Sequence, residues 1–168
     1  ADGRLAGYLF GMGPEEGRPG LQLGTAGASL PEGEYRLAGA YGEPTLAALA
    51  FRLGAYRYDR YRKTEAAPEL VLPPEADVAE VERLADAAFL ARDLVNTPAS
   101  DLGPEAFEAE IREFAARHGM SVKATVGDDL IAQNFPMIHA VGRASAESPR
   151  LLDLSWRNES HPRVTLVG

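Results

Sequence analysis

Residues 75–96 read EADVAEVERLADAAFLARDLVN and form the longest periodic segment of the sequence. Apolar residues recur there at spacings of three and four, which is the pattern of an amphipathic α-helix. Pro98 follows directly, and proline cannot continue a helix. We therefore predict one long helix over this range, with a buried face formed by Val78, Val81, Leu84, Ala85, Ala88, Ala91 and Val95.

A second helix is predicted downstream, over residues 104–118. Pro104 suits the first helical turn, and Glu105 complements the positive end of the helix dipole. Gly119 is a natural helix end. The spacing of the large apolar residues predicts a buried face made of Phe107, Ile111 and Phe114.

The remaining carboxyl-terminal part alternates between strand and helix patterns. Residues 120–127 alternate as a strand does, and residues 128–135 indicate a short helix that ends before Pro136. Two further strands are predicted at residues 149–156 and 163–168, separated by a polar turn.

The amino-terminal part is rich in turn-forming residues. Glycine and proline are frequent in residues 1–45, which favours short strands joined by turns. Strands are predicted at Leu5–Phe10, Tyr35–Leu37 and Leu70–Leu72, and a helix is predicted over residues 44–54. From Glu75 onward, the alternation of helices and strands predicts an α/β layered sheet that is partly parallel.

The composition narrows the possible functions. The chain of 168 residues contains no cysteine, which excludes disulfides and thiolate chemistry. We find no apolar stretch long enough to span a membrane and no signal peptide at the start, so the cytoplasm is the expected compartment. The formal net charge of −8 argues against a general nucleic-acid surface, which is normally basic.

Residues 52–63, RLGAYRYDRYRK, are the local exception, with five of the 17 basic side chains of the chain. They alternate with Tyr56, Tyr58 and Tyr61. Arginine beside aromatic residues is typical of single-stranded nucleic-acid binding. It is equally typical of an element that buries its rings and extends its charged heads into water, and the acidic net charge favours this second interpretation.

The individual titratable residues form no recognisable metal site. His118, His139 and His161 lack the spacing of a helical metal-binding pair. The acid pair in Gly127–Asp129 could bind Mg²⁺ or Mn²⁺, but its place before Leu130 favours a cap at a helix start.

Other candidate groups are no more specific. We expect Asp153 on the solvated face of its strand. The glycines of GMG at Gly11–Gly13, with Gly17 beyond, only faintly resemble a phosphate-binding loop. No nucleophile is predicted either, because the turn that would expose a reactive hydroxyl is missing around Ser100, Ser145 and Ser155.

Residues 91–111, ARDLVNTPASDLGPEAFEAEI, resemble the start of the catalytic domain in the leucyl aminopeptidase family, also called cytosol aminopeptidases. In that family a long helix ends in Asn-Thr-Pro and a second helix begins at a Pro-Glu pair. Asn96, Thr97 and Pro98, followed by Pro104 and Glu105, stand in those places.

The resemblance continues on both sides of this block. Downstream, Gly142, Arg143, Ala144 and Ser145 match a Val-Gly-Arg/Lys-Ala/Gly-Ser run, and Pro149, Arg150 and Leu151 match a Pro-Arg-Leu strand. Upstream, the stretch around Tyr58 is similar to a Tyr-Arg-Phe-Asp-x-Tyr run of the amino-terminal domain. Residues 1–74 are thus predicted to be a partial, small mixed α/β amino-terminal domain. Residues 75–168 are predicted to be a linker helix followed by the first helices and strands of an α/β peptidase domain.

The resemblance implies a two-metal exopeptidase, a hydrolase that removes amino-terminal residues from peptides with two Mn or Zn ions and that forms hexamers. In the family, the strand similar to RVTLVG is followed at once by a Lys-Gly pair, with an Asp a few residues later and an Asn-Thr-Asp-Ala-Glu-Gly-Arg run further on, and the Lys and the acids hold the metals. Because the sequence stops at Gly168, no catalytic, cofactor-binding or metal residue can be assigned here. We therefore expect a truncated, inactive segment that binds no metal itself.

A non-catalytic role is the alternative. The amino-terminal domain of the family resembles ADP-ribose-binding domains, and some bacterial members bind DNA. The chain would then be a binding module for DNA or a nucleotide-like ligand, or a module that only assembles oligomers. In the DNA-binding version, the contacts would be Arg57, Arg60, Arg62 and Lys63, although the net charge of −8 argues against nucleic acid as the partner.

Overall fold

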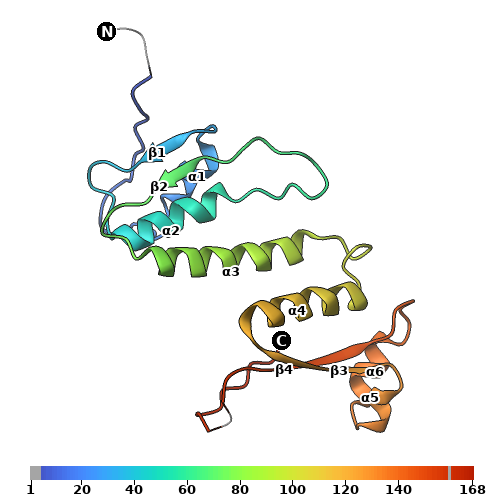
Figure 1. Ribbon diagram of the computed structural model, residues 1–168. Helices are drawn as coiled ribbons and strands as arrows, with labels where there is room; N and C mark the ends of the chain where they lie inside the picture. The colour runs from blue at the N-terminus through green and yellow to red at the C-terminus, as the bar shows by residue number, and fades with distance from the viewer. Residues whose placement is uncertain (1–4, 159) are drawn as a thin grey trace. The chain divides into compact units, whose positions relative to one another are not determined.

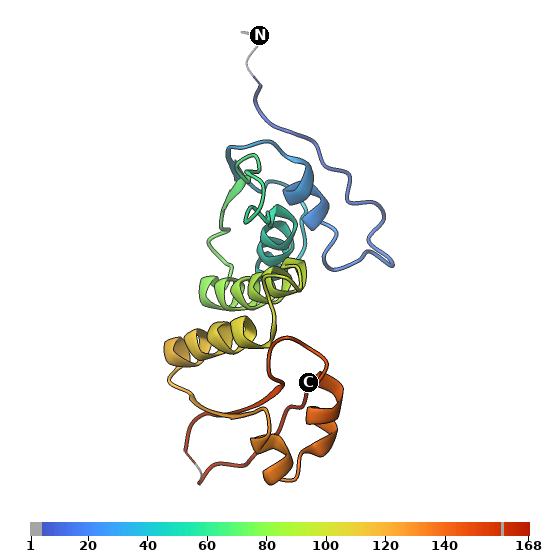
Figure 2. The ribbon, with the colours of Figure 1, turned by 90° about the vertical axis from the view of Figure 1, so that its right-hand side faces the viewer.

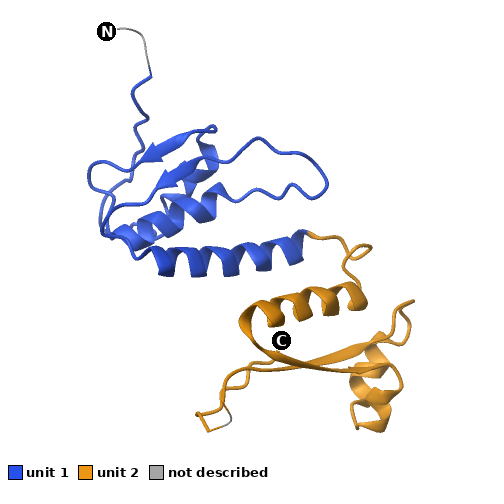
Figure 3. Ribbon diagram, viewed as in Figure 1, with its two compact units in different colours: residues 1–96 blue, residues 97–168 orange. Residues whose placement is uncertain are grey.

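The computed structural model describes residues 5–158 and 160–168 and divides them into two compact units, which meet at Asn96 and Thr97 (Figure 3). Helices and strands alternate in both units, so the predicted α/β class is confirmed (Figure 1). None of the helices in the described ranges has the length and apolar character needed to cross a bilayer.

The first unit holds two strands and three helices. Its elements are α1 (Gly24–Ser29), β1 (Glu34–Arg36), α2 (Pro44–Ala55), β2 (Glu69–Val71) and α3 (Val78–Asn96). The two strands pair in parallel, with Tyr35 opposite Leu70. Helices α1 and α2 lie side by side in both ribbon views (Figures 1 and 2).

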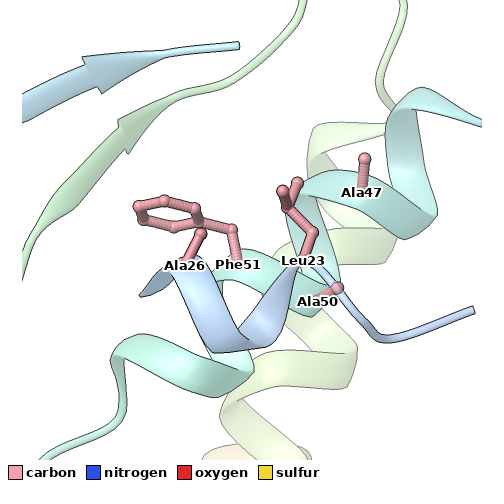
Figure 4. Packing of buried hydrophobic residues seen from close by; sticks show 5 residues of the cluster. All are labelled: Leu23, Ala26, Ala47, Ala50 and Phe51. Atoms are coloured by element: carbon pink, nitrogen blue, oxygen red, sulfur yellow. The ribbon is translucent and has the colours of Figure 1, made fainter. Parts of the chain in front are cut away.

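The core of the first unit lies where α1 meets α2. Leu23, Ala26, Ala47, Ala50 and Phe51 form one buried cluster, in which Ala26 lies beside the ring of Phe51 (Figure 4). A second cluster joins Ala48 of α2 to Val81 of α3, and Ala85 of α3 is also buried. These contacts explain why α3 is grouped with the first unit, whereas the boundary at residue 74 stays a prediction.

Side chains from outside the helices fix where α2 and α3 begin. The carboxylate of Glu43 accepts hydrogen bonds from the backbone N–H groups of Thr45 and Leu46, at 2.8 and 2.6 Å. These backbone bonds hold the pKa of Glu43 below its usual value. Asp77 does the same for α3, where its Oδ1 accepts from the N–H of Glu80 at 3.0 Å. Both are N-caps, which satisfy donors that the first turn leaves without partners.

The second unit contains a two-stranded antiparallel sheet and three helices. Its elements are α4 (Pro104–His118), β3 (Ser121–Val126), α5 (Asp129–Ala132), α6 (Pro136–Gly142) and β4 (Arg150–Ser155). In the sheet, Ala124 lies opposite Leu152. Gly119 takes the left-handed conformation (φ 65°) that ends α4, as predicted.

Two predicted strands are wrong. Residues 5–10 and 163–168 form no regular structure, and Leu9, Leu166 and Val167 are almost fully exposed. Both segments have strand-like composition but no partner in the described residues, and a strand needs neighbouring backbone to satisfy its N–H and C=O groups. The partly parallel sheet predicted after Glu75 is also wrong, because the described strands of that part, β3 and β4, pair antiparallel; the parallel pair is β1 with β2.

The predicted helix faces are only partly correct. Val81 and Ala85 of α3 are buried, but Val78, Leu84 and Val95 are exposed. On α4, Phe107 is 40% exposed, and the buried residue is Ala115. The periodicity located the helices correctly but overestimated the width of the buried stripe.

Candidate functional site

The segments that resemble the peptidase family meet at the first turn of α4. Gly103 is the N-cap of this helix and has no side chain to accept a hydrogen bond, and Pro104 has no N–H. The first free donor is the N–H of Glu105. It donates to Oε2 of Glu147 at 2.8 Å, from the loop between α6 and β4. A carboxylate also suits the positive end of the helix dipole.

Gly103 makes this approach possible. A Cβ atom at residue 103 would lie 2.5 Å from Oε2 of Glu147, well inside van der Waals contact. Any side chain there would therefore displace the capping carboxylate. The cap of α4 therefore needs both the Gly-Pro-Glu start of the helix and the loop that contains Glu147.

A second close contact joins the two downstream motifs. A Cβ atom on Gly142 would overlap the ring of Pro149. The glycine that ends α6 is therefore required by the proline that precedes β4. This contact brings the Gly-Arg-Ala-Ser run against the Pro-Arg-Leu strand.

An ion pair links β4 to α4. Nη1 of Arg150 lies 2.7 Å from Oε2 of Glu108, and both side chains are only 12–13% exposed. Arg112, one turn along α4, binds the other oxygen of Glu108 at 2.7 Å. The hydrogen bond from Arg112 and that from Arg150 hold the pKa of Glu108 below its usual value.

The same loop borders a small polar hollow of about 230 Å³. It is lined by Gly127, Asp128, His139, Arg143, Ser145, Ala146, Glu147, Ser148 and Pro149. Oδ1 of Asp128 lies 3.3 Å from Nε2 of His139. The backbone N–H of Glu147 donates to the hydroxyl oxygen of Ser145 at 3.2 Å. Part of the Gly-Arg-Ala-Ser run therefore lies at the rim of the hollow.

The acid pair after β3 behaves differently from the prediction. Helix α5 does begin at Asp129, but the N-cap residue Asp128 makes no side-chain capping bond. Its carboxylate pairs with His139 instead. The capping role proposed for Asp128 is therefore wrong, because its backbone is helical (φ −67°, ψ −21°), whereas a capping residue has a non-helical, typically extended, conformation.

The other histidines take part in local structure. His118 is in the last turn of α4, where a cation complements the dipole, and its ring packs on Phe114 at 4.5 Å between centroids. His161 lies in a turn closed by its N–H and the carbonyl of Asn158.

The predicted solvated position of Asp153 is confirmed, since it is exposed on β4. The three serines are scattered. Ser100 lies in the turn after α3, Ser145 at the hollow and Ser155 at the end of β4.

The basic stretch of the first unit is largely built into the fold. Arg57 donates to the carbonyls of Ala28 and Gly54, which lie near the ends of α1 and α2. Tyr56 donates to Asp93 of α3 at 2.6 Å and packs on Phe89. Burial, followed by the bond to Asp93, raises the pKa of Tyr56.

The last residues of this stretch are different, because Arg62 and Lys63 are exposed. Arg60 lies over the ring of Tyr61. Tyr56 packs into the fold as the interpretation of buried rings predicts, but Arg57 binds backbone carbonyls instead of extending its head into water. A nucleic-acid interface is not favoured, since one of its four proposed cations is already committed to backbone carbonyls.

The described residues do not fit a metal centre. Residues 5–158 and 160–168 contain no group of three or more His, Cys, Asp or Glu side chains that could hold a metal ion. Asp128 and His139 are a pair with no third ligand among them. No metal-dependent step is therefore derived from this chain.

Two functional positions were missed in the sequence. Glu147 was seen only as part of a loop and Glu108 only as a helix residue. One signal was available: a glycine followed by proline at a helix start cannot cap the first turn, so a distant acceptor is required. The identity of that acceptor depends on contacts over 42 residues of sequence.

Comparison with known proteins agrees with this arrangement. Residues 1–73 match the profile described as "M17 aminopeptidase, N-terminal domain", and residues 89–168 match "Cytosol aminopeptidase family, catalytic domain". Both profiles describe one class of peptidases. The chain belongs to the cytosol aminopeptidase family, which confirms the resemblance inferred from Asn96–Pro98 and the motifs around it.

Individual relatives support the same assignment. A probable cytosol aminopeptidase of Corynebacterium efficiens is 35% identical over 159 residues, covering 86% of this chain and 31% of the relative. The crystal structure of a cytosol aminopeptidase from Coxiella burnetii superimposes with a TM-score of 0.76 at 34% identity, covering 85% of this chain and 32% of that one. A bottromycin maturation enzyme, BotP, in complex with Mn, gives a TM-score of 0.73 at 34% identity, covering 89% and 36%.

The chain spans 26–31% of the length of the similar curated relatives. Its two matched parts follow the order of the family, amino-terminal domain first and catalytic domain second. The contacts at Glu147, Gly142 and Arg150 all lie in the catalytic-domain part.

Proposed function

We propose that this chain is the amino-terminal part of a metal-dependent aminopeptidase that removes amino-terminal residues from peptides. The observation that carries the proposal is the order of the two matched domains along the chain. Residues 1–74 would form the amino-terminal domain, and residues 75–168 the linker helix and the first part of the peptidase domain. Our proposal includes two Mn or Zn ions, a hexameric assembly and a cytoplasmic location for the whole enzyme.

In this proposal the chain supplies scaffold and no catalytic group. Two of its acidic side chains have structural partners, since Glu147 caps the first turn of α4 and Glu108 pairs with Arg150. The complex of the related BotP with Mn supports the choice of a divalent ion for the whole enzyme. The ligands would come from parts of the whole enzyme that this chain, which covers 31% of its relative from Corynebacterium efficiens, does not include.

The test compares this chain with the longer polypeptide encoded by its source gene. With Mn²⁺ added, we expect the longer protein to hydrolyse leucyl-p-nitroanilide, and a chelator to abolish this activity. The 168-residue chain should give only the background rate. Hydrolysis by the short chain would contradict its role as scaffold, and an inactive longer protein in the presence of Mn²⁺ or Zn²⁺ would contradict the proposed enzyme.

A further inference from the structure

The polar hollow between α6 and β4 collects charged groups of both signs. Its volume of about 230 Å³ is below the ~300–1,000 Å³ of pockets that hold drug-sized ligands. It can therefore accommodate only a small molecule. Its lining is predominantly polar, with Arg143 and His139 facing the same space as Asp128 and Glu147.

Arg143 is a cation of this hollow whose side chain has no partner among the residues that the structure describes. Its side chain makes no ion pair or hydrogen bond within the described part of the chain. A guanidinium group offers five donors in a planar fork that matches the two oxygens of a carboxylate. The hydroxyl of Ser145 accepts from Glu147, which leaves its own hydrogen available to a ligand.

The acidic side of the hollow has unused acceptor capacity. Glu147 is half-buried, and its bond to the N–H of Glu105 involves only its Oε2 atom. An ionised carboxylate has about four lone-pair sites, so Glu147 can accept further donors. Asp128 shares its Oδ1 with His139 but is almost fully exposed, which makes it the weaker partner.

These charges select a dipolar ligand. A simple anion would meet Arg143 but be repelled by Glu147 and Asp128, whereas a simple cation would meet the acids but be repelled by Arg143. We propose that the hollow binds a free α-amino acid, with its carboxylate on Arg143 and its ammonium group on Glu147. Choosing an amino acid as the ligand rests on the proposed function, because an aminopeptidase releases one from each peptide.

The experiment is a calorimetric or NMR titration of the 168-residue chain with L-leucine and two analogues that each lack one charge. These are 4-methylpentanoate, without the ammonium group, and isopentylamine, without the carboxylate. L-Leucine should bind about tenfold more tightly than either analogue, since charged hydrogen bonds made at both ends add to the affinity. Equal binding of the three compounds would overturn the proposal.

Variants assign the two ends of the ligand. Arg143→Ala should weaken L-leucine and 4-methylpentanoate about tenfold and leave isopentylamine unchanged. Arg62→Ala, an exposed arginine of the first unit, is the matched control and should bind all three compounds as the parent chain does. Unchanged L-leucine binding in Arg143→Ala would overturn the proposal.

Glu147→Gln tests the acidic end without removing the cap, because the amide oxygen still accepts from Glu105. This variant should weaken L-leucine and isopentylamine but not 4-methylpentanoate. Retained affinity for the amine would contradict the role of Glu147. These titrations measure binding and do not depend on hydrolysis. A longer protein without peptidase activity would contradict the proposed function but would not change the binding of L-leucine to the hollow, so the two proposals are tested separately.

Discussion

The two units hold their helices by different physical means. In the first unit, α1 and α2 come so close that backbone touches backbone: a Cβ atom on Gly27 would overlap the carbonyl oxygen of Phe51, and one on Gly54 would overlap that of Gly24. In the second unit, α4 is tied by carboxylates, with Glu147 on its first turn and Glu108 on Arg150 of β4.

The difference extends to the buried residues. The first unit buries Leu23, Phe51 and Val81 together with several alanines, and the described part of the second unit buries only Leu130 among its large side chains. A unit with a small apolar core depends more on its polar contacts. We therefore expect the stability of the first unit to respond mainly to changes in side-chain volume, and that of the second unit mainly to changes in charge and pH.

Gly54→Ala should have the largest effect, because the added methyl group would overlap the carbonyl of Gly24 and push α1 from α2. Overpacking of this kind costs about 1–3 kcal/mol and occasionally more. The better helix propensity of alanine returns at most about 1 kcal/mol. The steric cost should prevail, with a net loss of about 2 kcal/mol in the free energy of unfolding, measured by circular dichroism of the helices in urea.

Gly7→Ala is the matched control, since a Cβ atom there meets nothing within 4 Å. It should leave the unfolding midpoint unchanged. A Gly54→Ala chain as stable as the parent would show that the first unit does not need the close approach of α1 to α2. It would then contradict the claim that this unit depends on backbone packing.

The strongest sequence predictions were those with local causes. Helices α2, α3 and α4 follow from apolar periodicity with proline at their starts or beyond their ends, and α4 begins and ends at the predicted residues, Pro104 and His118. The short strands β1 and β2 were also located to within one residue by their β-branched and aromatic content.

The misses have non-local causes. Helix α1 contains mainly glycine and alanine and has no periodic signal, so it depends on its packing against α2. Helix α6 was missed because Pro136 was taken as an end, whereas proline is equally suited to a first turn. The polar contacts of Glu147 and Glu108 join residues 42 positions apart, which no local pattern encodes.

Glu108→Gln should have an intermediate effect, confined to the second unit. Removing the charge leaves Arg150, whose side chain is 12% exposed, with only a neutral partner. A hydrogen bond to a charged group contributes about 1.5–3 kcal/mol, and glutamine retains part of it, so we expect a loss of about 1.5 kcal/mol. The single tryptophan of the chain, Trp156, bonds to the carbonyl of His118 and reports unfolding of this unit by fluorescence.

The pH dependence sharpens the same comparison. The pKa of Glu108 in the folded protein lies below the value of 4.5 for a free side chain. Its contribution to stability is therefore complete above pH 4.5 and is lost as the pH falls through the lowered pKa. Glu108→Gln should flatten the fall of Trp156-detected stability in this range. An equally steep fall in the variant would assign the acid sensitivity to another group.

Arg112→Ala is the control for the pair itself. Arg112 binds the same carboxylate, but its side chain is 48% exposed, and exposed pairs of this kind contribute only about 0.3–0.5 kcal/mol. In double-mutant cycles, the coupling of Glu108 to Arg150 should exceed its coupling to Arg112. Equal coupling energies would mean that the burial of Arg150 does not strengthen its ion pair with Glu108.

A smaller effect than that of Glu108→Gln is expected at Glu147, where two substitutions separate the contribution of charge from that of hydrogen bonding. Glu147→Ala removes the carboxylate that caps the first turn of α4 and should cost about 1 kcal/mol, as the loss of other N-caps does. Glu147→Gln keeps an acceptor and loses only the interaction with the dipole, which is about 0.3–1 kcal/mol. Trp156 fluorescence in urea measures both. If Glu147→Gln lowered the free energy of unfolding as much as Glu147→Ala does, the cap would stabilise α4 through its charge. If Glu147→Gln left the free energy of unfolding unchanged, the hydrogen bond to the N–H of Glu105 would account for the whole effect of the cap.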